Sequence, residues 1–165
     1  MRHHRLEREQ HVTRPPAQAF ELFADARRLG AITPPWLAFR VVTPAPIEMR
    51  RGTLIDYRLR LHGVPVRWRT RIERWEPSER FVDVQVAGPY RLWHHTHEFE
   101  PDGEGGTVIR DTVRYALPLG PLGALAHILF VRLDLVRIFD FRRDAVERLL
   151  GARAPSAGAP GTLAS

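Results

Sequence analysis

Residues 121–150 form the only long helix candidate in the chain, and they limit what the other residues can fold into. Apolar residues recur there at helical spacing over about eight turns: Leu122, Leu125, Leu129, Leu133, Val136, Phe139, Ala145, Val146 and Leu149. Pro121 suits the first turn of a helix, and Gly151 suits the position after its end. Residues 126–131 are apolar nearly all the way round, whereas residues 140–148 alternate in charge. We therefore predict one helix whose first half is enclosed and whose second half faces water.

Residues 37–117 follow a period of two, which is typical of strands with one covered face. Turn-forming segments at 43–46, 62–65, 76–79, 88–89 and 101–106 divide this stretch into six strands. The alternation is clearest in two sets of inward-facing residues: Ile55, Tyr57, Leu59 and Leu61, then Val66, Trp68, Thr70 and Ile72. Tight connections between such strands predict an antiparallel meander.

Upstream of the meander, residues 6–13 are predicted to form a strand and residues 15–24 a short helix capped by Thr13, with a second short helical turn to about Leu29. One strand, two short helices, six strands and one long helix favour an α+β fold. In it, a curved seven-stranded antiparallel sheet wraps around the C-terminal helix. We expect a single domain over residues 1–151, with a mostly apolar cavity where the sheet and the helix stand apart. Residues 152–165, rich in Ala, Gly and Pro, are expected to be a disordered tail.

Composition excludes several kinds of site. The net charge is +6, but all 25 basic residues are arginines mixed with 19 acidic residues along the chain, so no basic groove for nucleic acid is predicted. Without cysteine or lysine, thiol catalysis, thiolate metal sites and Schiff bases are excluded. Serine occurs only at Ser78, Ser156 and Ser165, so the sheet cannot carry a serine triad. With neither a signal-like N-terminus nor an apolar run of about 20 residues, we expect a cytoplasmic protein without stable membrane insertion.

Polar side chains fall on the covered face of two predicted neighbouring strands. His95 and His97 are two residues apart and share a face with Trp93, while His94 points the other way. On the next strand, Asp111 and Tyr115 alternate with apolar residues. Because a buried carboxylate without a partner is costly, Asp111 is expected to accept a hydrogen bond from His95 or His97.

The phase of residues 81–87 depends on the turn that follows. A three-residue loop at 88–90 pairs Phe81 with His97, Asp83 with His95, and Gln85 with Trp93 on the cavity side. A two-residue loop instead pairs Val84 with Trp93 and turns the valines inward.

Four segments resemble the SRPBCC superfamily, which includes START domains, polyketide cyclases and pollen-allergen-like proteins, and its small bacterial ligand-binding members in particular. These segments are RFVDVQ (80–85), GPYRLWHHTHEF (88–99), DTVRYALP (111–118) and GPLG (120–123) with FV (130–131). The resemblance covers roughly residues 5–150 and implies the helix-grip fold, which agrees with the order of elements above. It also favours the arrangement with Asp83 and Gln85 inside. It does not imply a reaction, because this fold serves both carriers and enzymes.

Three functions fit these residues. The first is binding of a small hydrophobic or amphipathic ligand, such as a lipid, polyketide or quinone-like molecule, between the sheet and the first half of the helix. Its candidate contacts are Tyr57, Trp68, Asp83, Gln85, Trp93, His95, His97, Asp111, Tyr115 and Phe130. The second is a polyketide aromatase or cyclase with His95 or His97 as base and Tyr115 or Asp111 polarising a carbonyl, and the third is a protein-interaction module that uses the arginine-rich face. The polar set can equally be a buried network that fixes strand register.

We predict no metal site and no cofactor. Two histidines at this spacing with Asp83 or Asp111 as a third ligand are a weak metal signal. The protein is expected to be a monomer or weak homodimer.

Overall fold

The computed structural model describes residues 3–118 and 120–153. Its strands are β1 (His4–Val12), β2 (Arg40–Val41), β3 (Leu54–Leu61), β4 (Val64–Glu76), β5 (Arg80–Ala87), β6 (Leu92–Pro101) and β7 (Thr107–Ala116). Its helical segments are α1 (Pro16–Ala24), the 3-10 turns η1 (Ala26–Ile32) and η2 (Pro35–Leu37), α2 (Gly120–Ala126), a π-helical turn η3 (His127–Val131) and α3 (Arg132–Leu150). This order confirms the predicted α+β helix-grip fold.

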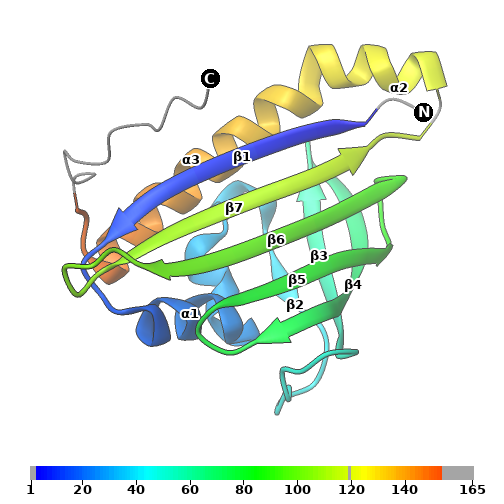
Figure 1. The fold of residues 1–165 in the computed structure, drawn as a ribbon. Coiled ribbons are helices and arrows are strands. Elements are labelled where there is room, and N and C mark those ends of the chain that lie inside the picture. Colours follow the sequence, from blue (N-terminus) through cyan, green and yellow to red (C-terminus); the bar gives the residue numbers. More distant parts are fainter. Residues whose placement is uncertain (1–2, 119, 154–165) are drawn as a thin grey trace, which may run out of the picture.

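The strands form one seven-stranded sheet in the order β1-β7-β6-β5-β4-β3-β2. Every neighbouring pair is antiparallel. The sheet curves around α3, and α1 closes the end at which α3 finishes (Figure 1). The largest core cluster lies at that end, where Phe20 and Phe23 of α1 meet Phe99 of β6 and Val146 of α3.

The predicted enclosure of the first half of the C-terminal helix is wrong. Leu122 is 68% exposed, Leu125 53% and Phe130 56%, whereas Leu135, Phe139, Ala145, Val146 and Leu150 of α3 are buried. Figure 1 shows the reason, because α2 projects beyond the sheet and only α3 crosses its concave face. In the charged second half, one apolar stripe is enough to bury the helix, since charged residues such as Arg143, Asp144 and Arg148 lie away from it and are exposed.

The start and the end of the domain are joined through Thr13. Its amide donates to the carbonyl of Gly151 at 3.1 Å, and its hydroxyl donates to the carbonyl of Leu150 at 2.9 Å. Gly151 has a positive φ of 81°, and a Cβ there would lie 2.3 Å from Thr13 Oγ1, so glycine is required. Thr13 therefore does not cap α1, which begins after Pro15 without a side-chain cap.

The predicted disordered tail begins too early. Ala152 forms a β-bridge with Val12, and the amide of Arg153 donates to the carbonyl of His11 at 3.0 Å. The Arg153 side chain also donates to Asp102 Oδ2 at 2.6 Å. Residues 152–153 are thus part of the domain, and the other predicted tail residues, 154–165, lie outside the described residues.

Truncation after Gly151 should therefore cost more stability than truncation after Arg153. The shorter protein loses a backbone hydrogen bond and an ion pair. Because one hydrogen bond contributes about 1 kcal/mol, the melting temperature should fall by roughly 2–4 °C or more relative to the longer protein. Thermal unfolding of the two truncated proteins measures this difference, and equal melting temperatures would mean that residues 152–153 do not hold the domain together.

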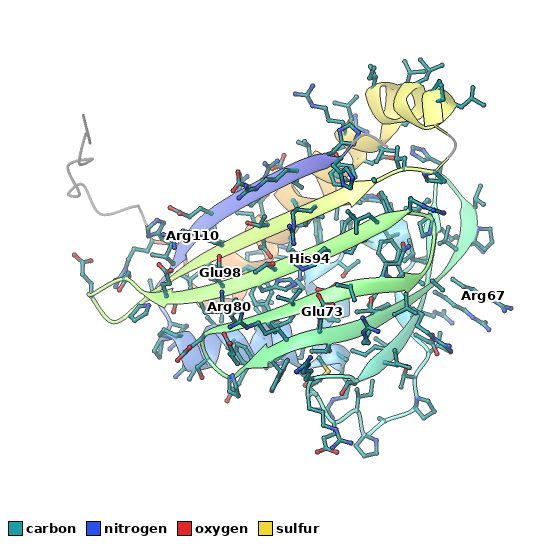
Figure 2. All side chains as sticks on the ribbon, turned by 45° about the vertical axis from the view of Figure 1, so that its right-hand side comes forward. Arg67, Glu73, Arg80, His94, Glu98 and Arg110 are labelled. Carbon is teal, nitrogen blue, oxygen red and sulfur yellow. The ribbon has the colours of Figure 1, made fainter. Side chains whose placement is uncertain are left out.

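The convex face of the sheet carries alternating charges, which Figure 2 labels along β4 to β7. Arg110 contacts Glu9 at 2.7 Å and Glu100 at 2.5 Å, and Arg80 lies 3.6 Å from Glu98. His94, predicted to point away from the cavity, lies 3.5 Å from Glu73 on this face. Arg80 and Arg110 therefore have acidic partners on neighbouring strands, and the absence of a nucleic-acid groove stays a prediction.

Candidate ligand-binding site

A cavity of about 190 Å³ lies between the concave face of the sheet and α3. Its walls are mainly apolar and aromatic, and they include Phe23, Leu37, Phe39, Ile55, Tyr57, Leu59, Trp68, Ile72, Tyr90, Trp93, Leu135, Ile138 and Phe139. An apolar cavity of about 150 Å³ is enough to hold benzene. This one can therefore hold a ligand of at least one ring. It lies against the middle of the predicted 121–150 helix and not against its first half.

Strand register brings a polar group to one end of this cavity. Phe81 pairs with His97 and Asp83 with His95 across β5 and β6. Across β6 and β7, His97 pairs with Asp111. The first two pairs are those expected for the three-residue loop. Ladder pairing stops at Val84 and His94, however, so Gln85 does not reach Trp93.

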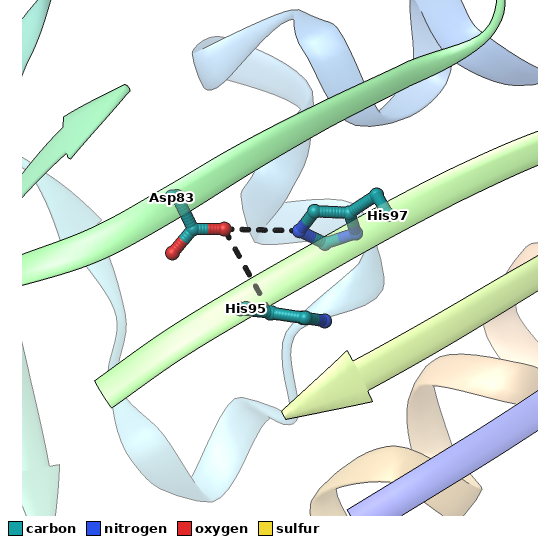
Figure 3. Close-up of side chains that lie close together, drawn as sticks. All are labelled: Asp83, His95 and His97. Atoms are coloured by element: carbon teal, nitrogen blue, oxygen red, sulfur yellow. Dashed lines mark hydrogen bonds and ion pairs between the residues drawn. The ribbon is translucent and has the colours of Figure 1, made fainter. Parts of the chain in front are cut away.

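Two histidines and two aspartates form a closed network at this end. His95 Nε2 lies 2.8 Å from Asp111 Oδ1, and His97 Nε2 lies 3.0 Å from Asp83 Oδ2 (Figure 3 shows Asp83 with both histidines). His97 Nδ1 also lies 2.8 Å from Asp111 Oδ1, in a contact too oblique for a well-formed hydrogen bond. The remaining pair, His95 Nδ1 and Asp83 Oδ2, is 3.8 Å apart. The expected bond to Asp111 is present, and Asp111 contacts both rings.

The contacts of the two histidines indicate which of them is charged. Both nitrogens of His97 lie within 3.0 Å of a carboxylate oxygen. Two carboxylates beside one ring favour its protonated form, so we assign His97 as the imidazolium. His95 has only one such contact and is neutral. The network thus holds two carboxylates and one imidazolium, with a net charge of −1.

The pKa values shift in the directions that this assignment requires. Burial and the nearby charge of His97 lower the pKa of His95 to about 4. Burial also opposes the charge on His97, but its contacts with Asp111 and Asp83 outweigh burial and raise its pKa. For Asp111, burial favours the neutral acid, yet the two histidines hold its pKa well below the ordinary value. Burial likewise opposes ionisation of Asp83, but His97 and His95 lower its pKa.

Arg142 is a cavity residue that the sequence did not indicate. It projects from α3, one turn after Phe139, and its guanidinium lies 5.2 Å from the ring centre of Phe23 and 5.9 Å from that of Phe139. Within residues 3–118 and 120–153 it forms no ion pair, and its Nε is buried without a hydrogen-bond partner. The alternating charges of residues 140–148 predicted a segment that faces water, so Arg142 was not predicted to line the cavity. The signal was its spacing of three from Phe139, which places both residues on one helix face.

The predicted contact residues divide into two groups. Six line the cavity: Tyr57, Trp68, Asp83, Trp93, His95 and His97. The other four, Gln85, Asp111, Tyr115 and Phe130, do not line it.

Each residue of the second group has another place in the fold. Asp111 lies behind the histidines, and Tyr115 packs beside Trp93 at 6.3 Å between ring centres. Gln85 binds the backbone of Tyr90 with both ends of its amide, at 2.7 and 3.2 Å, and so stabilises the β5–β6 turn. Phe130 lies on the exposed part of the helix, with its ring 6.1 Å from that of His62. None of these four can touch a ligand inside the cavity without rearrangement.

Asp83, His95 and His97 could hold a metal ion, because each offers a ligand atom within 4.8 Å of the others. One carboxylate and two imidazoles suit a zinc-like ion. A metal would have to displace the proton of His97 Nε2, which already bonds Asp83. The sequence prediction of no metal site therefore stays a prediction.

A curved sheet wrapped around a C-terminal helix, with an apolar cavity between them, defines the helix-grip class of the SRPBCC superfamily. Residues 3–151 match the model of one family in particular, and the chain belongs to that family, polyketide cyclase / dehydrase and lipid transport.

Solved structures support the same fold at low sequence identity. A protein of Thermus thermophilus is 22% identical, with a TM-score of 0.63 over 88% of this chain and 99% of that one. A START superfamily protein of Mycobacterium smegmatis is 13% identical, with a TM-score of 0.64 over 88% and 99%. A Chromobacterium violaceum protein, 13% identical, reaches a TM-score of 0.68 over 92% and 98%.

No curated protein matches this sequence. Among the described helices, none is long and apolar enough to cross a membrane.

Proposed function

We propose that this protein binds a small hydrophobic or amphipathic molecule, of the lipid, polyketide or quinone-like kind, in the cavity between the sheet and α3. The observation that carries the proposal is the cavity of about 190 Å³ with aromatic walls and a buried charged network at one end. Native cores leave few spaces larger than a water molecule. Apolar walls supply affinity, and a few polar groups fix the orientation of a ligand.

A groove next to the cavity supplies an entrance. This groove, of about 430 Å³, shares Leu37, Leu61 and Ile138 with the cavity wall. At its rim, His62 Nε2 lies 2.5 Å from Asp134 Oδ2 and links the β3–β4 turn to α3. Both side chains are partly exposed, so the link contributes little to stability and can open.

The arrangement favours binding over acid–base catalysis. Both nitrogens of His97 already contact carboxylates, and a pKa of about 4 makes His95 a weak base at neutral pH. The carbonyl-polarising candidates, Asp111 and Tyr115, stand outside the cavity wall. An aromatase or cyclase would therefore have to use other groups or a rearranged network. The monomer or weak homodimer and the cytoplasmic location remain predictions.

Filling the cavity should weaken ligand binding strongly. Leu59 and Leu54 are both on β3, but Leu59 lines the cavity while Leu54 is on the other face and 48% exposed. We expect Leu59→Trp to weaken binding of the neutral fluorescent probe N-phenyl-1-naphthylamine by about tenfold or more, because an indole takes up the space that the probe needs. The matched control, Leu54→Trp, should bind like the unmodified protein.

Fluorescence titration measures this difference, and thermal unfolding shows whether each variant is folded. A folded Leu59→Trp protein with unchanged affinity would place the probe outside the cavity and contradict the proposal. Native mass spectrometry of protein purified from its own host would then identify the natural ligand as a co-purifying mass.

A further inference from the structure

The charges around the cavity sum to zero without a ligand. The network of Asp83, Asp111, His95 and His97 carries −1 when His97 is the protonated ring, as assigned above from its contacts with two carboxylates. Arg142 carries +1, and the cavity wall holds no arginine besides it and no carboxylate besides Asp83 among the described residues. The positive charge of Arg142 contributes to the lowered pKa of Asp83, although the two form no ion pair. Arg142 thus balances the network from a distance.

Arg142 forms no hydrogen bond with another residue that the structure describes. Its Nε is buried and has no partner in the part of the chain that the structure describes. The rings of Phe23 and Phe139 hold the guanidinium beside the cavity by cation–π contact. No acceptor can approach the enclosed Nε, so a ligand in the cavity meets the Nη groups, for which the described residues provide no hydrogen-bond acceptor. A ligand that displaces water from these groups and brings an acceptor therefore gains more than one that does not.

We propose that the ligand is an uncharged molecule that presents a carbonyl oxygen, as in a ketone, quinone or ester, to Arg142, and that the cavity discriminates against carboxylic acids. This inference rests on the ligand-binding function proposed above. A carbonyl accepts an Nη–H of Arg142 and leaves the total charge at zero. A carboxylate would also accept it, but would leave one uncompensated negative charge in a buried site that already holds Asp83. A pure hydrocarbon leaves the donor unsatisfied.

Three probes on one naphthalene skeleton test this preference. They are 2-acetonaphthone, 2-naphthoate and 2-ethylnaphthalene, which carry a carbonyl, a carboxylate and no polar group, respectively. At pH 7.5, quenching of tryptophan fluorescence should show that the unmodified protein binds the ketone about tenfold more tightly than each of the other two. Against ethylnaphthalene this is the effect of one well-placed hydrogen bond, and against naphthoate it is the effect of the uncompensated charge.

Arg142→Met supplies the decisive variant, because methionine keeps an apolar stem against Phe23 and Phe139 but has no donor. It should remove the advantage of the ketone over ethylnaphthalene while ethylnaphthalene still binds. Arg143→Met is the matched control, since Arg143 is the next residue on α3, faces solvent and contacts Asp144 at 3.1 Å. It should keep the ketone preference.

The results separate this inference from the proposed function. If the unmodified protein binds naphthoate most tightly, or if Arg142→Met keeps the full ketone preference, the inference is wrong while the cavity remains a ligand site. Equal binding of ketone and hydrocarbon by the unmodified protein would overturn it in the same way. If none of the three probes binds, the ligand-binding function fails and the inference fails with it.

Discussion

Replacing Asp111 by alanine should lower the free energy of unfolding by about 3–5 kcal/mol, the range for breaking a buried ion pair by removing one partner. Asp111 is 6% exposed and its Oδ1 lies 2.8 Å from nitrogens of both His95 and His97. Its removal leaves a buried imidazolium with one carboxylate where it had two, and leaves the N–H of His95 without an acceptor. Chemical denaturation at pH 7 measures the loss.

The control for this prediction is an aspartate whose ion pair lies on the protein surface and is exposed to solvent. Asp56 of β3 accepts from Arg69 at 2.7 and 2.9 Å, but the pair is largely exposed. Because exposed pairs contribute little, Asp56→Ala should destabilise the protein several-fold less than Asp111→Ala. Similar effects of the two substitutions, or a neutral Asp111→Ala, would mean that the network does not hold β6 and β7 together.

The sheet and its covered face could be predicted from the sequence because strands have a period of two. Alternation in the residues from Ile109 to Leu117 places Asp111 on the covered face without any knowledge of the fold. The spacing of His95 and His97 does the same for β6. Pairing between strands then follows from the length of the turn, which is why the pairs of Asp83 and Phe81 were predictable once a three-residue loop was assumed.

Gln85 shows the limit of that reasoning. Its position on β5 was predicted, but its amide satisfies the backbone of Tyr90 in the turn. A side chain that can form hydrogen bonds with nearby backbone groups competes with the pairing between strands. The alternation of residues along one strand does not show which of the two interactions forms.

The C-terminal helix was predicted with nearly correct ends, yet its environment was predicted in reverse. Periodicity reports which residues of a helix share a face, but not where the sheet beneath it ends. Leu122 and Phe130 are apolar and exposed because their part of the helix lies past that edge. Arg142 is the opposite case, since its long apolar stem can lie along aromatic rings with its charged end at a cavity. The residue types alone could not show that Leu122 and Phe130 are exposed or that Arg142 lines the cavity.

Lowering the pH should destabilise the folded protein, because His95 is neutral in the folded state and takes up a proton on unfolding. Its folded pKa is about 4, against 6.5 in the unfolded chain. Between these values the unfolded chain binds a proton that the folded protein does not, so stability falls as the pH decreases from about 6.5 to about 4. The difference in pKa corresponds to roughly 3 kcal/mol, at about 1.4 kcal/mol for each pH unit.

The other members of the network act outside this window. The pKa of His97 is raised, so its contribution is complete below 6.5 and is lost as the pH rises through its folded value. The pKa values of Asp83 and Asp111 are lowered, so their contributions are present above 3.8 and are lost only below it. Within the network, the loss of stability between about pH 6.5 and 4 therefore belongs to His95.

His95→Gln tests this assignment, because glutamine can still donate to Asp111 but does not titrate. Between pH 6.5 and 4, the unfolding free energy of the variant should therefore decrease by roughly 3 kcal/mol less than that of the unmodified protein. His94→Gln is the matched control on the solvent side of the same strand, and it should keep the original slope. If His95→Gln keeps that slope as well, the pKa of His95 is not lowered in the folded protein, and another group takes up the proton.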